Sequence, residues 1–223
     1  MKPYYQDASV TIYHGDCAIA EQWLSGDLLV TDPPYGISWS KGLSATRSSR
    51  AHDGIQNDHN TSARDLALSW WGDRPGVVFG SLYAPFPMNL RHVLVWEKPG
   101  DAGVFGSTTG YRRDVEAVFL TGTWPRVDAK WGSVVRSTMR KVGGAASPAG
   151  RTGHPHTKPV DLLCTLMQRA PSGVVADPFM GSGSTLVAAK AMGRTAIGIE
   201  IEERYCEIAA RRCSQETLDL GAA

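Results

Sequence analysis

Short apolar runs recur along the chain and constrain its fold more than any other feature of the sequence. Each run is only a few residues long and rich in β-branched side chains, which is typical of strands buried on both faces of a sheet. We predict strands at Leu28–Thr31, Val77–Phe79, Val93–Trp96, Val115–Leu120, Val174–Ala176 and Ala196–Ile199.

Helical patterns lie between and after these runs. Apolar residues recur at helical spacing within residues 162–167 and again within 205–212. A third helix is predicted at Ser184–Met192, because this segment follows glycines and stops at Gly193, where a left-handed cap is usual. The alternation of strands and helices predicts an α/β fold with an open, doubly wound, mostly parallel sheet.

The composition is that of a globular chain. Its 223 residues are 42% hydrophobic, so we expect a single domain over residues 1–223. No apolar run approaches the roughly 20 residues of a membrane-spanning helix, and residues 1–7 lack a secretory signal, so we expect a cytoplasmic protein without a membrane partner. The four cysteines show no metal-binding spacing, and we predict no metal.

Positive charge gathers in one part of a chain whose net charge is +1. Between residues 123 and 153, six Lys and Arg residues stand against one Asp. Such a block can neutralise nucleic-acid phosphates, but solvated loops of similar charge are common, so both interpretations stay open. Residues 36–60 form a second polar stretch, which is either a functional loop or a partly disordered one.

A glycine-containing turn in residues 177–183 joins a predicted strand to a predicted helix. Gly181 and Gly183 let the backbone approach a ligand, and the helix start offers free N–H groups. Glu200 follows the next strand, where an acidic residue accepts hydrogen bonds from ribose hydroxyls. Leu186 breaks the dinucleotide fingerprint, and no P-loop lysine is present. We therefore predict a nucleoside cofactor site of another kind, with a ligand-free turn as the alternative.

A second motif, Asp32-Pro33-Pro34-Tyr35, directly follows the first predicted strand. Open α/β sheets bind their ligands at this end of a strand. The prolines stiffen the turn, so the Asp32 carboxylate and the Pro33 carbonyl can together accept the two hydrogens of an exocyclic amino group. Tyr35 can stack on a base that has left the duplex. A merely rigid turn is the alternative interpretation.

Together the two motifs resemble those of the amino-methylating DNA methyltransferases, the adenine-N6 and cytosine-N4 family. The family's catalytic motif matches Asp32–Tyr35, and its cofactor motif matches Phe179–Gly183, preceded here by Asp177. The catalytic motif comes first, which is the permuted order of the family's β class. The resemblance implies a Rossmann-like methyltransferase fold and S-adenosyl-L-methionine as cofactor.

Two further elements are similar to the family's pattern. Gly15-Asp16 matches its Gly-Asp, which implies that Asp16 contacts the cofactor adenine. Residues 154–159 approximate its His-Pro-Thr-Gln-Lys-Pro element, which helps to hold the methionine carboxylate of the cofactor. His156 and Thr157 depart from the pattern, but Lys158 remains as a cation for that carboxylate.

The resemblance also assigns the DNA contacts. Residues 123–153 occupy the place of a short target-recognition insertion, and residues 36–60 that of a mobile loop that closes on DNA. A solvated loop is the alternative for each. The candidate contacts to phosphates or guanine edges are Arg126, Lys130, Arg136, Arg140 and Lys141.

The function predicted from this resemblance is methylation of adenine N6 in double-stranded DNA after base flipping. Asp in the first place of the catalytic motif favours adenine, since Ser is commoner there among the cytosine-N4 members. Cytosine-N4 methylation is the runner-up, and a protein-glutamine methyltransferase is a distant third. A non-catalytic DNA-binding module of the same fold is the alternative from a different class. A homodimer and a cognate restriction enzyme are further hypotheses about partners.

Overall fold

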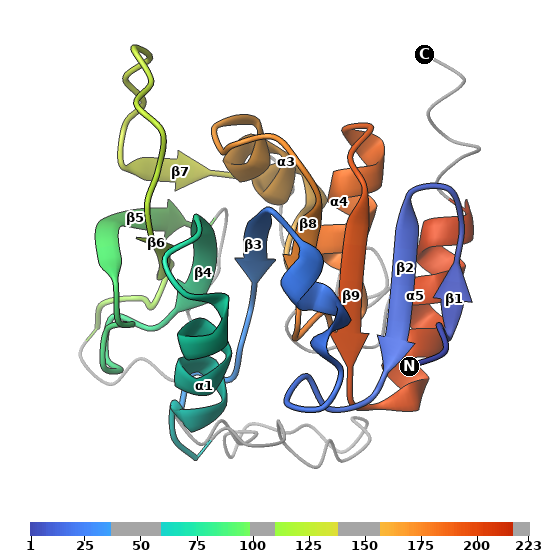
Figure 1. Cartoon of the computed structure of the whole chain (residues 1–223). Helices are drawn as coiled ribbons and strands as arrows, with labels where there is room; N and C mark the ends of the chain where they lie inside the picture. Colours follow the sequence, from blue (N-terminus) through green and yellow to red (C-terminus); the bar gives the residue numbers. More distant parts are fainter. Residues whose placement is uncertain (37–58, 99–109, 138–156, 216–223) are drawn as a thin grey trace.

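The computed structural model describes residues 1–36, 59–98, 110–137 and 157–215. Within them, one sheet of nine strands has the order β1-β2-β9-β8-β3-β4-β6-β5-β7 (Figure 1). The strands are β1 (Tyr5–Gln6), β2 (Val10–His14), β3 (Leu28–Thr31), β4 (Gly76–Gly80), β5 (Leu90–Glu97), β6 (Val115–Thr121), β7 (Val134–Arg136), β8 (Val175–Asp177) and β9 (Ala196–Glu200).

Five helical segments accompany the sheet in the described ranges. They are the 3₁₀-helix η1 (Glu21–Ser25) and the α-helices α1 (Ser62–Trp71), α3 (Val160–Gln168), α4 (Ser184–Ala191) and α5 (Glu203–Gln215). None of these helices is long and apolar enough to span a membrane.

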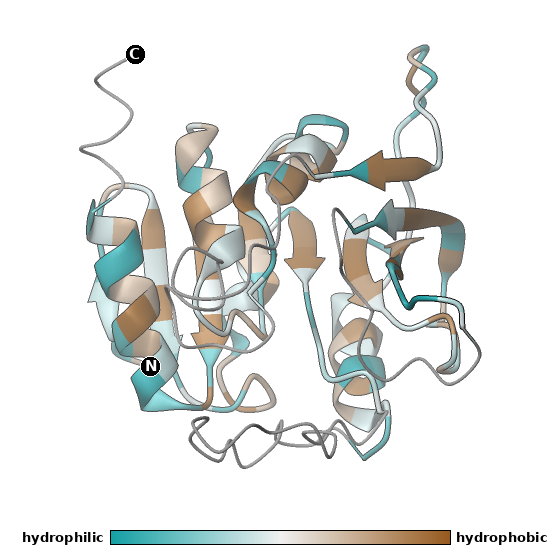
Figure 2. Ribbon diagram, turned by 180° about the vertical axis from the view of Figure 1, so that it is seen from behind, coloured by the Kyte–Doolittle hydropathy of each residue, from teal (hydrophilic) through white to brown (hydrophobic). Residues whose placement is uncertain are grey.

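Helices cover both faces of the sheet. Because consecutive strand residues point to opposite faces, β3 contributes side chains to both of the resulting cores. Leu28 and Val30 of β3 pack in one core with residues of α3, α4 and α5. Leu29 packs on the other side, with Trp23 of η1 and Trp71 of α1. Figures 1 and 2 show the two faces, and in Figure 2 the apolar colour concentrates along the strands.

The predicted fold class is confirmed. All six predicted strands are present, and β3 has the predicted bounds. The three predicted helices correspond to α3, α4 and α5. Most strand pairs are parallel, and the antiparallel ones involve β1 or β6. Strands β1, β2 and β7 and helix α1 were not predicted from the sequence.

The centre of the sheet contains a topological switch point. β3 and β8 are parallel neighbours; β4 follows on the far side of β3, whereas β9 lies on the far side of β8. A crevice opens at the carboxyl ends of the strands where the order reverses in this way, and open α/β sheets bind ligands there. We call this side of the sheet the carboxyl edge.

Candidate active site

A cavity of about 710 Å³ lies at the carboxyl edge and brings both sequence motifs together. Asp32 follows β3 directly, and Asp177 is the last residue of β8. The predicted site residues that line the cavity are Asp16, Asp32, Pro33, Pro34, Tyr35, Lys158, Asp177, Phe179, Gly181 and Glu200. Its size and mixed polar and apolar lining are typical of a small-molecule site.

The Asp32 carboxylate is held by two side chains. Lys158 Nζ lies 2.9 Å from Asp32 Oδ2, and the Tyr35 hydroxyl lies 2.6 Å from Asp32 Oδ1. The motif turn places Asp32 and Tyr35 three residues apart, whereas Lys158 comes from just before α3. The carboxylate therefore has a partner on each of its oxygens before any substrate binds.

Glu116, at the start of β6, connects the remaining groups. Its Oε1 lies 2.7 Å from Lys158 Nζ and 2.6 Å from the Tyr35 hydroxyl. Its Oε2 lies 2.8 Å from the Nζ of Lys98, which follows β5. Sequence reasoning assigned a role to neither Glu116 nor Lys98, yet both line the cavity.

Burial and neighbouring charges shift the pKa values of these groups. Burial alone would raise the pKa of Glu116, but the charges of Lys158 and Lys98 outweigh it and hold this pKa well below its ordinary value. Burial alone would lower the pKa of Lys158, but Asp32 and Glu116 raise it. Burial, reinforced by the two carboxylates, raises the pKa of Tyr35. Lys158 and Glu116 therefore stay charged around pH 7, and the Tyr35 hydroxyl stays neutral.

The end of β8 has a different environment. Asp177 is 2% exposed, and its Oδ1 accepts hydrogen bonds from the Thr31 hydroxyl at 2.7 Å and the Phe179 N–H at 3.1 Å. Burial raises the pKa of Asp177 to about 7, against the opposing effect of a hydrogen bond from the Thr185 side chain and of the two from Thr31 and Phe179. Asp177 thus stabilises the turn that leads toward the glycines.

Glu200, at the end of β9, is oriented by backbone donors. Its Oε2 accepts the Gly181 N–H at 2.9 Å, and its Oε1 accepts the Glu202 N–H at 2.8 Å. Burial raises the pKa of this carboxylate. Each oxygen retains a lone pair for a further donor, and Glu200 lines the cavity, so the carboxylate fits the two hydroxyls of a ribose.

The glycines of the turn are required by its shape. Gly183 has a φ of +78° and precedes α4, and a Cβ added to it would lie 2.7 Å from the Cβ of Ala209. Gly181 has a φ of +50° and lines the cavity, which Gly183 does not. Gly181 thus lets the backbone form the cavity wall, and Gly183 lets α4 pack closely against α5.

Lys158 lies in the cavity but has contacts that the sequence resemblance did not imply. Its ammonium group contacts Asp32, Glu116 and the Tyr35 hydroxyl, the last at 3.1 Å. Its predicted role in binding the cofactor carboxylate is untested and stays a prediction. Residues 154–156, which precede it in the same motif, lie outside the described residues.

The predicted target-recognition stretch, residues 123–153, includes a connection, the strand β7 and residues outside the described ranges. Arg126 and Lys130 lie in the connection of residues 122–133 between β6 and β7. Because β6 is antiparallel to β4, Thr121 pairs with Gly76 at the beginning of β4, so this connection leaves the sheet opposite the carboxyl edge. Figure 1 shows it projecting from the top, whereas β3 and β9 point downward.

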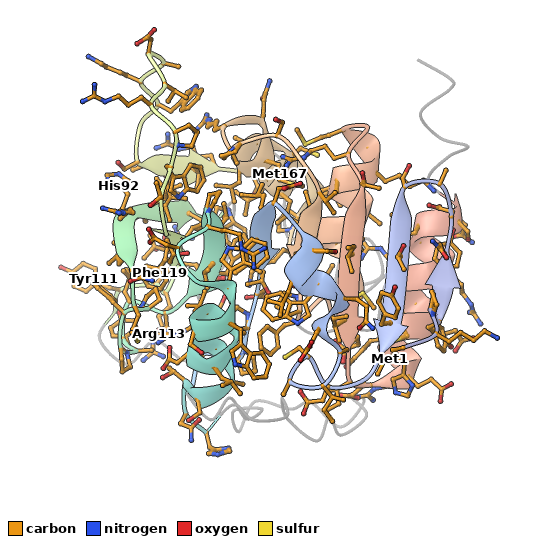
Figure 3. The ribbon with its side chains drawn as sticks, in the orientation of Figure 1. Met1, His92, Tyr111, Arg113, Phe119 and Met167 are labelled. Atoms are coloured by element: carbon orange, nitrogen blue, oxygen red, sulfur yellow. The ribbon has the colours of Figure 1, made fainter. Side chains whose placement is uncertain are left out.

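Two labelled side chains in Figure 3 mark these opposite sides. His92 lies near the base of the 122–133 connection, and its Nε2 is 2.8 Å from the Ser133 hydroxyl. Arg113 lies lower in the same view and lines the cavity. Arg126 and Lys130 are therefore separated from the cavity by the height of the sheet, and their contact with DNA stays a prediction.

The other predicted DNA contacts are placed only in part. Arg136 ends β7, which runs parallel to β5 and so ends at the carboxyl edge, where Arg136 forms an exposed ion pair with Glu97. Arg140 and Lys141 lie outside the described residues. Of residues 36–60, the structure describes Gly36, His59 and Asn60, and the last two line the cavity.

Comparison with known proteins gives the family. The sequence pattern of a DNA methylase family matches residues 121–211. The type II methyltransferase M.ScaI of Streptomyces caespitosus is 40% identical, over 98% of this chain and 86% of its own. The putative methylase YubD of Escherichia coli (strain K12) is 43% identical, over 94% of this chain and 93% of its own.

Solved structures share the fold. The M1.HpyAVI–SAM complex has a TM-score of 0.63 at 21% identity, over 91% of this chain and 98% of that one. The cytosine-N4-specific PvuII DNA methyltransferase has a TM-score of 0.63 at 20% identity, over 95% of this chain and 88% of that one.

The Rossmann-like sheet and the two motifs at its carboxyl edge define the class of S-adenosylmethionine-dependent methyltransferases. Within this class, the chain belongs to the amino-methylating DNA methyltransferases, the N6/N4 family.

Proposed function

We propose that this protein transfers a methyl group from S-adenosylmethionine to the N6 amino group of adenine in double-stranded DNA, and that residues 1–223 act as one methyltransferase domain. The observation that carries the proposal is the Asp32 carboxylate, fixed in a cavity that also contains Glu200 and the glycine turn. A base inside a duplex cannot reach such a cavity, so the target adenine must flip out.

Asp32 and Pro33 act on the amino group. An exocyclic amino nitrogen is a poor nucleophile because its lone pair is delocalised into the ring. The Asp32 carboxylate and the Pro33 carbonyl accept its two hydrogens and direct the lone pair, while Pro34 stiffens the turn and Tyr35 offers an aromatic face. The bound cofactor supplies an electrophilic methyl group.

Residues from the other strand ends hold the cofactor. Glu200 accepts hydrogen bonds from the ribose hydroxyls, and Asp16, which follows β2, contacts the adenine. Phe179 and Gly181 form the wall of the cavity between them. Asp177 and Gly183 act on this wall indirectly, through the conformation of the turn.

The proposed contacts with DNA begin at the carboxyl edge. Arg136 pairs with Glu97 at the end of β5 and has an exposed side chain, so it is a candidate contact for a phosphate. Arg126, Lys130, Arg140 and Lys141 remain candidate contacts from the sequence. The homodimer and the cognate restriction enzyme also stay hypotheses.

Cytosine N4 is the second candidate target. The PvuII enzyme, a cytosine-N4-specific methyltransferase, has the same fold over nearly the whole chain. Both bases carry a similar amino group, and the preference for adenine rests on Asp as the first residue of the catalytic motif.

The identity of the methylated nucleoside tests the proposal. The protein is incubated with S-adenosylmethionine labelled in its methyl group and unmethylated genomic DNA, and the DNA is then digested to nucleosides for mass analysis. We expect labelled 6-methyladenine. Labelled 4-methylcytosine instead would establish the second candidate. No labelled nucleoside, from protein that binds the cofactor, would contradict both.

A further inference from the structure

Four charged side chains form a closed, partly buried cluster beside the cavity. Two are positive, Lys98 and Lys158, and two are negative, Asp32 and Glu116. The side chains of Lys158 and Glu116 are only 9% and 11% exposed. Removing charges from water is costly unless each has a partner, so the loss of a single member leaves an uncompensated charge at this depth.

Lys158 uses its full set of donors within this cluster. An ammonium group has three N–H donors. Asp32 Oδ2, Glu116 Oε1 and the Tyr35 hydroxyl provide three acceptors at 2.9, 2.7 and 3.1 Å. In this arrangement no donor of Lys158 is left for a cofactor carboxylate. The charge of Lys158 therefore acts on Asp32, the carboxylate for which we propose contact with the substrate.

Glu116 determines where Lys158 lies. It is the one acceptor in the described part of the cluster that contacts both lysines and the Tyr35 hydroxyl. It is the second residue of β6, and Lys98 follows the antiparallel neighbour β5, so the sheet itself fixes the pair. Glu116 thereby links a rigid part of the fold to the two groups that hold Asp32.

We infer that Glu116 and Lys158 are positioning residues for methyl transfer: Glu116 holds Lys158, and Lys158 together with Tyr35 orients the Asp32 carboxylate toward the target amino group. The inference rests on the proposed catalytic role of Asp32. Lys158 donates to one oxygen of Asp32, and the Tyr35 hydroxyl shares its single proton between the other oxygen and Glu116, which leaves a lone pair on each Asp32 oxygen for the substrate.

The chemical advantage is orientation before the reaction. A carboxylate that is already fixed needs no reorganisation when the amino group arrives. A misplacement of about 1 Å at a reacting group can cost on the order of 100-fold in rate. Losing Lys158 or Glu116 should therefore slow the chemical step and leave cofactor binding intact.

The experiment separates the chemical step from binding. We would measure single-turnover methyl transfer at saturating DNA and cofactor, and the Kd for S-adenosylmethionine, in Lys158→Met and Glu116→Gln. We expect transfer to fall by about 10- to 100-fold in each variant, with the Kd within about threefold of the wild type. Cofactor binding also shows that each variant is folded.

The double variant Lys158→Met/Glu116→Gln tests whether the two residues act in one chain. If Glu116 acts through Lys158, the double variant should be no slower than the slower single variant, because effects in one network do not add. This variant removes one charge of each sign, so it keeps the cluster balanced even where a single variant folds poorly.

A distant ion pair serves as the control. Asp7 and Lys190 form a partly buried pair that is absent from the cavity lining. Asp7→Asn should change the rate of transfer by less than about twofold, because it removes a comparable pair away from the site.

Three results would overturn the inference. A Kd raised more than tenfold in Lys158→Met, with transfer nearly unchanged at saturation, would assign Lys158 to the cofactor. Unchanged transfer in Glu116→Gln would remove Glu116 from the mechanism, and additive losses in the double variant would disconnect the two residues. If the wild type itself methylates no DNA, the proposed function fails instead.

Discussion

The same dipeptide, Asp-Pro, stands at the carboxyl ends of the two central strands of the sheet, as Asp32-Pro33 after β3 and Asp177-Pro178 at the end of β8, but the two aspartates have different surroundings. Asp32, after β3, contacts the charged Lys158 and the Tyr35 hydroxyl. Asp177, at the end of β8, accepts hydrogen bonds from the neutral groups of Thr31, Thr185 and the Phe179 N–H, and burial raises its pKa to about 7. Similar carboxylates in neighbouring places can thus serve different tasks, because their environments differ.

From this contrast we propose that the chemistry takes place on the β3 side and that the cofactor binds on the β8–β9 side. The assignment follows from what each carboxylate faces. Asp32 is fixed with acceptor capacity left for a substrate, whereas Asp177 is directed into the turn that contains Gly181 and Gly183. Variants on each side should therefore affect different steps.

Glu200→Gln tests cofactor binding on the β8–β9 side, and we expect it to have a larger effect than the Asp177→Asn substitution described below. The amide cannot accept on both sides, so it must lose either the Gly181 or the Glu202 N–H bond and offer a poorer acceptor to the ribose. We expect the Kd for S-adenosylmethionine to rise about 10- to 100-fold, since hydrogen bonds to charged groups contribute about 1.5–3 kcal/mol. Isothermal titration calorimetry measures this change.

The matched control is Glu202→Gln, which alters a neighbouring carboxylate but keeps the backbone N–H that Glu200 accepts. We expect the Kd to stay within about threefold of the wild type. Equal affinities of Glu200→Gln and the wild type would contradict the assignment of Glu200 to the ribose.

Asp177→Asn tests the difference between the aspartates through pH. The folded pKa of about 7 lies above the ordinary value of 3.8, so the folded protein retains this proton where the unfolded chain has lost it. The resulting stability is fully present below pH 4 and is lost as the pH rises through 7. Asparagine does not titrate, so the wild type should lose stability relative to the variant from pH 5 to 8.

The expected relative loss is on the order of 2 kcal/mol, because one pKa unit corresponds to about 1.4 kcal/mol. Urea unfolding of both proteins at intervals between pH 5 and 8 measures it. Parallel stability curves would show that the environment of Asp177 does not raise its pKa, and the contrast with Asp32 would lose its electrostatic basis.

Much of the fold was predictable because its signals are local. The run Leu28–Thr31 is apolar at every position but the last, and β3 has those bounds. β2 was missed because Val10 and Ile12 alternate with polar residues in a short segment near the N-terminus. α1 was missed because it directly follows a long polar stretch, although it buries Leu68 and Trp71.

The site was predictable only where its residues form motifs. Asp32, Tyr35 and Glu200 stand in recognisable local patterns, and all three line the cavity. Glu116 and Lys98 are single charged residues at strand ends, and the β5–β6 pairing that brings them to the cavity is not visible in the sequence. The direction of β6 is equally hidden in the sequence, so the pattern does not show that the connection of residues 122–133 leaves the sheet opposite the carboxyl edge.

The most direct test of the account compares Asp32→Asn with Asp177→Asn in two assays, single-turnover methyl transfer at saturating cofactor and the Kd for S-adenosylmethionine. The account predicts that Asp32→Asn lowers transfer at least about 100-fold and keeps the Kd within about threefold, whereas Asp177→Asn changes mainly the Kd. Transfer by Asp32→Asn within tenfold of the wild type, or a loss of cofactor affinity equal to that of Asp177→Asn, would contradict it.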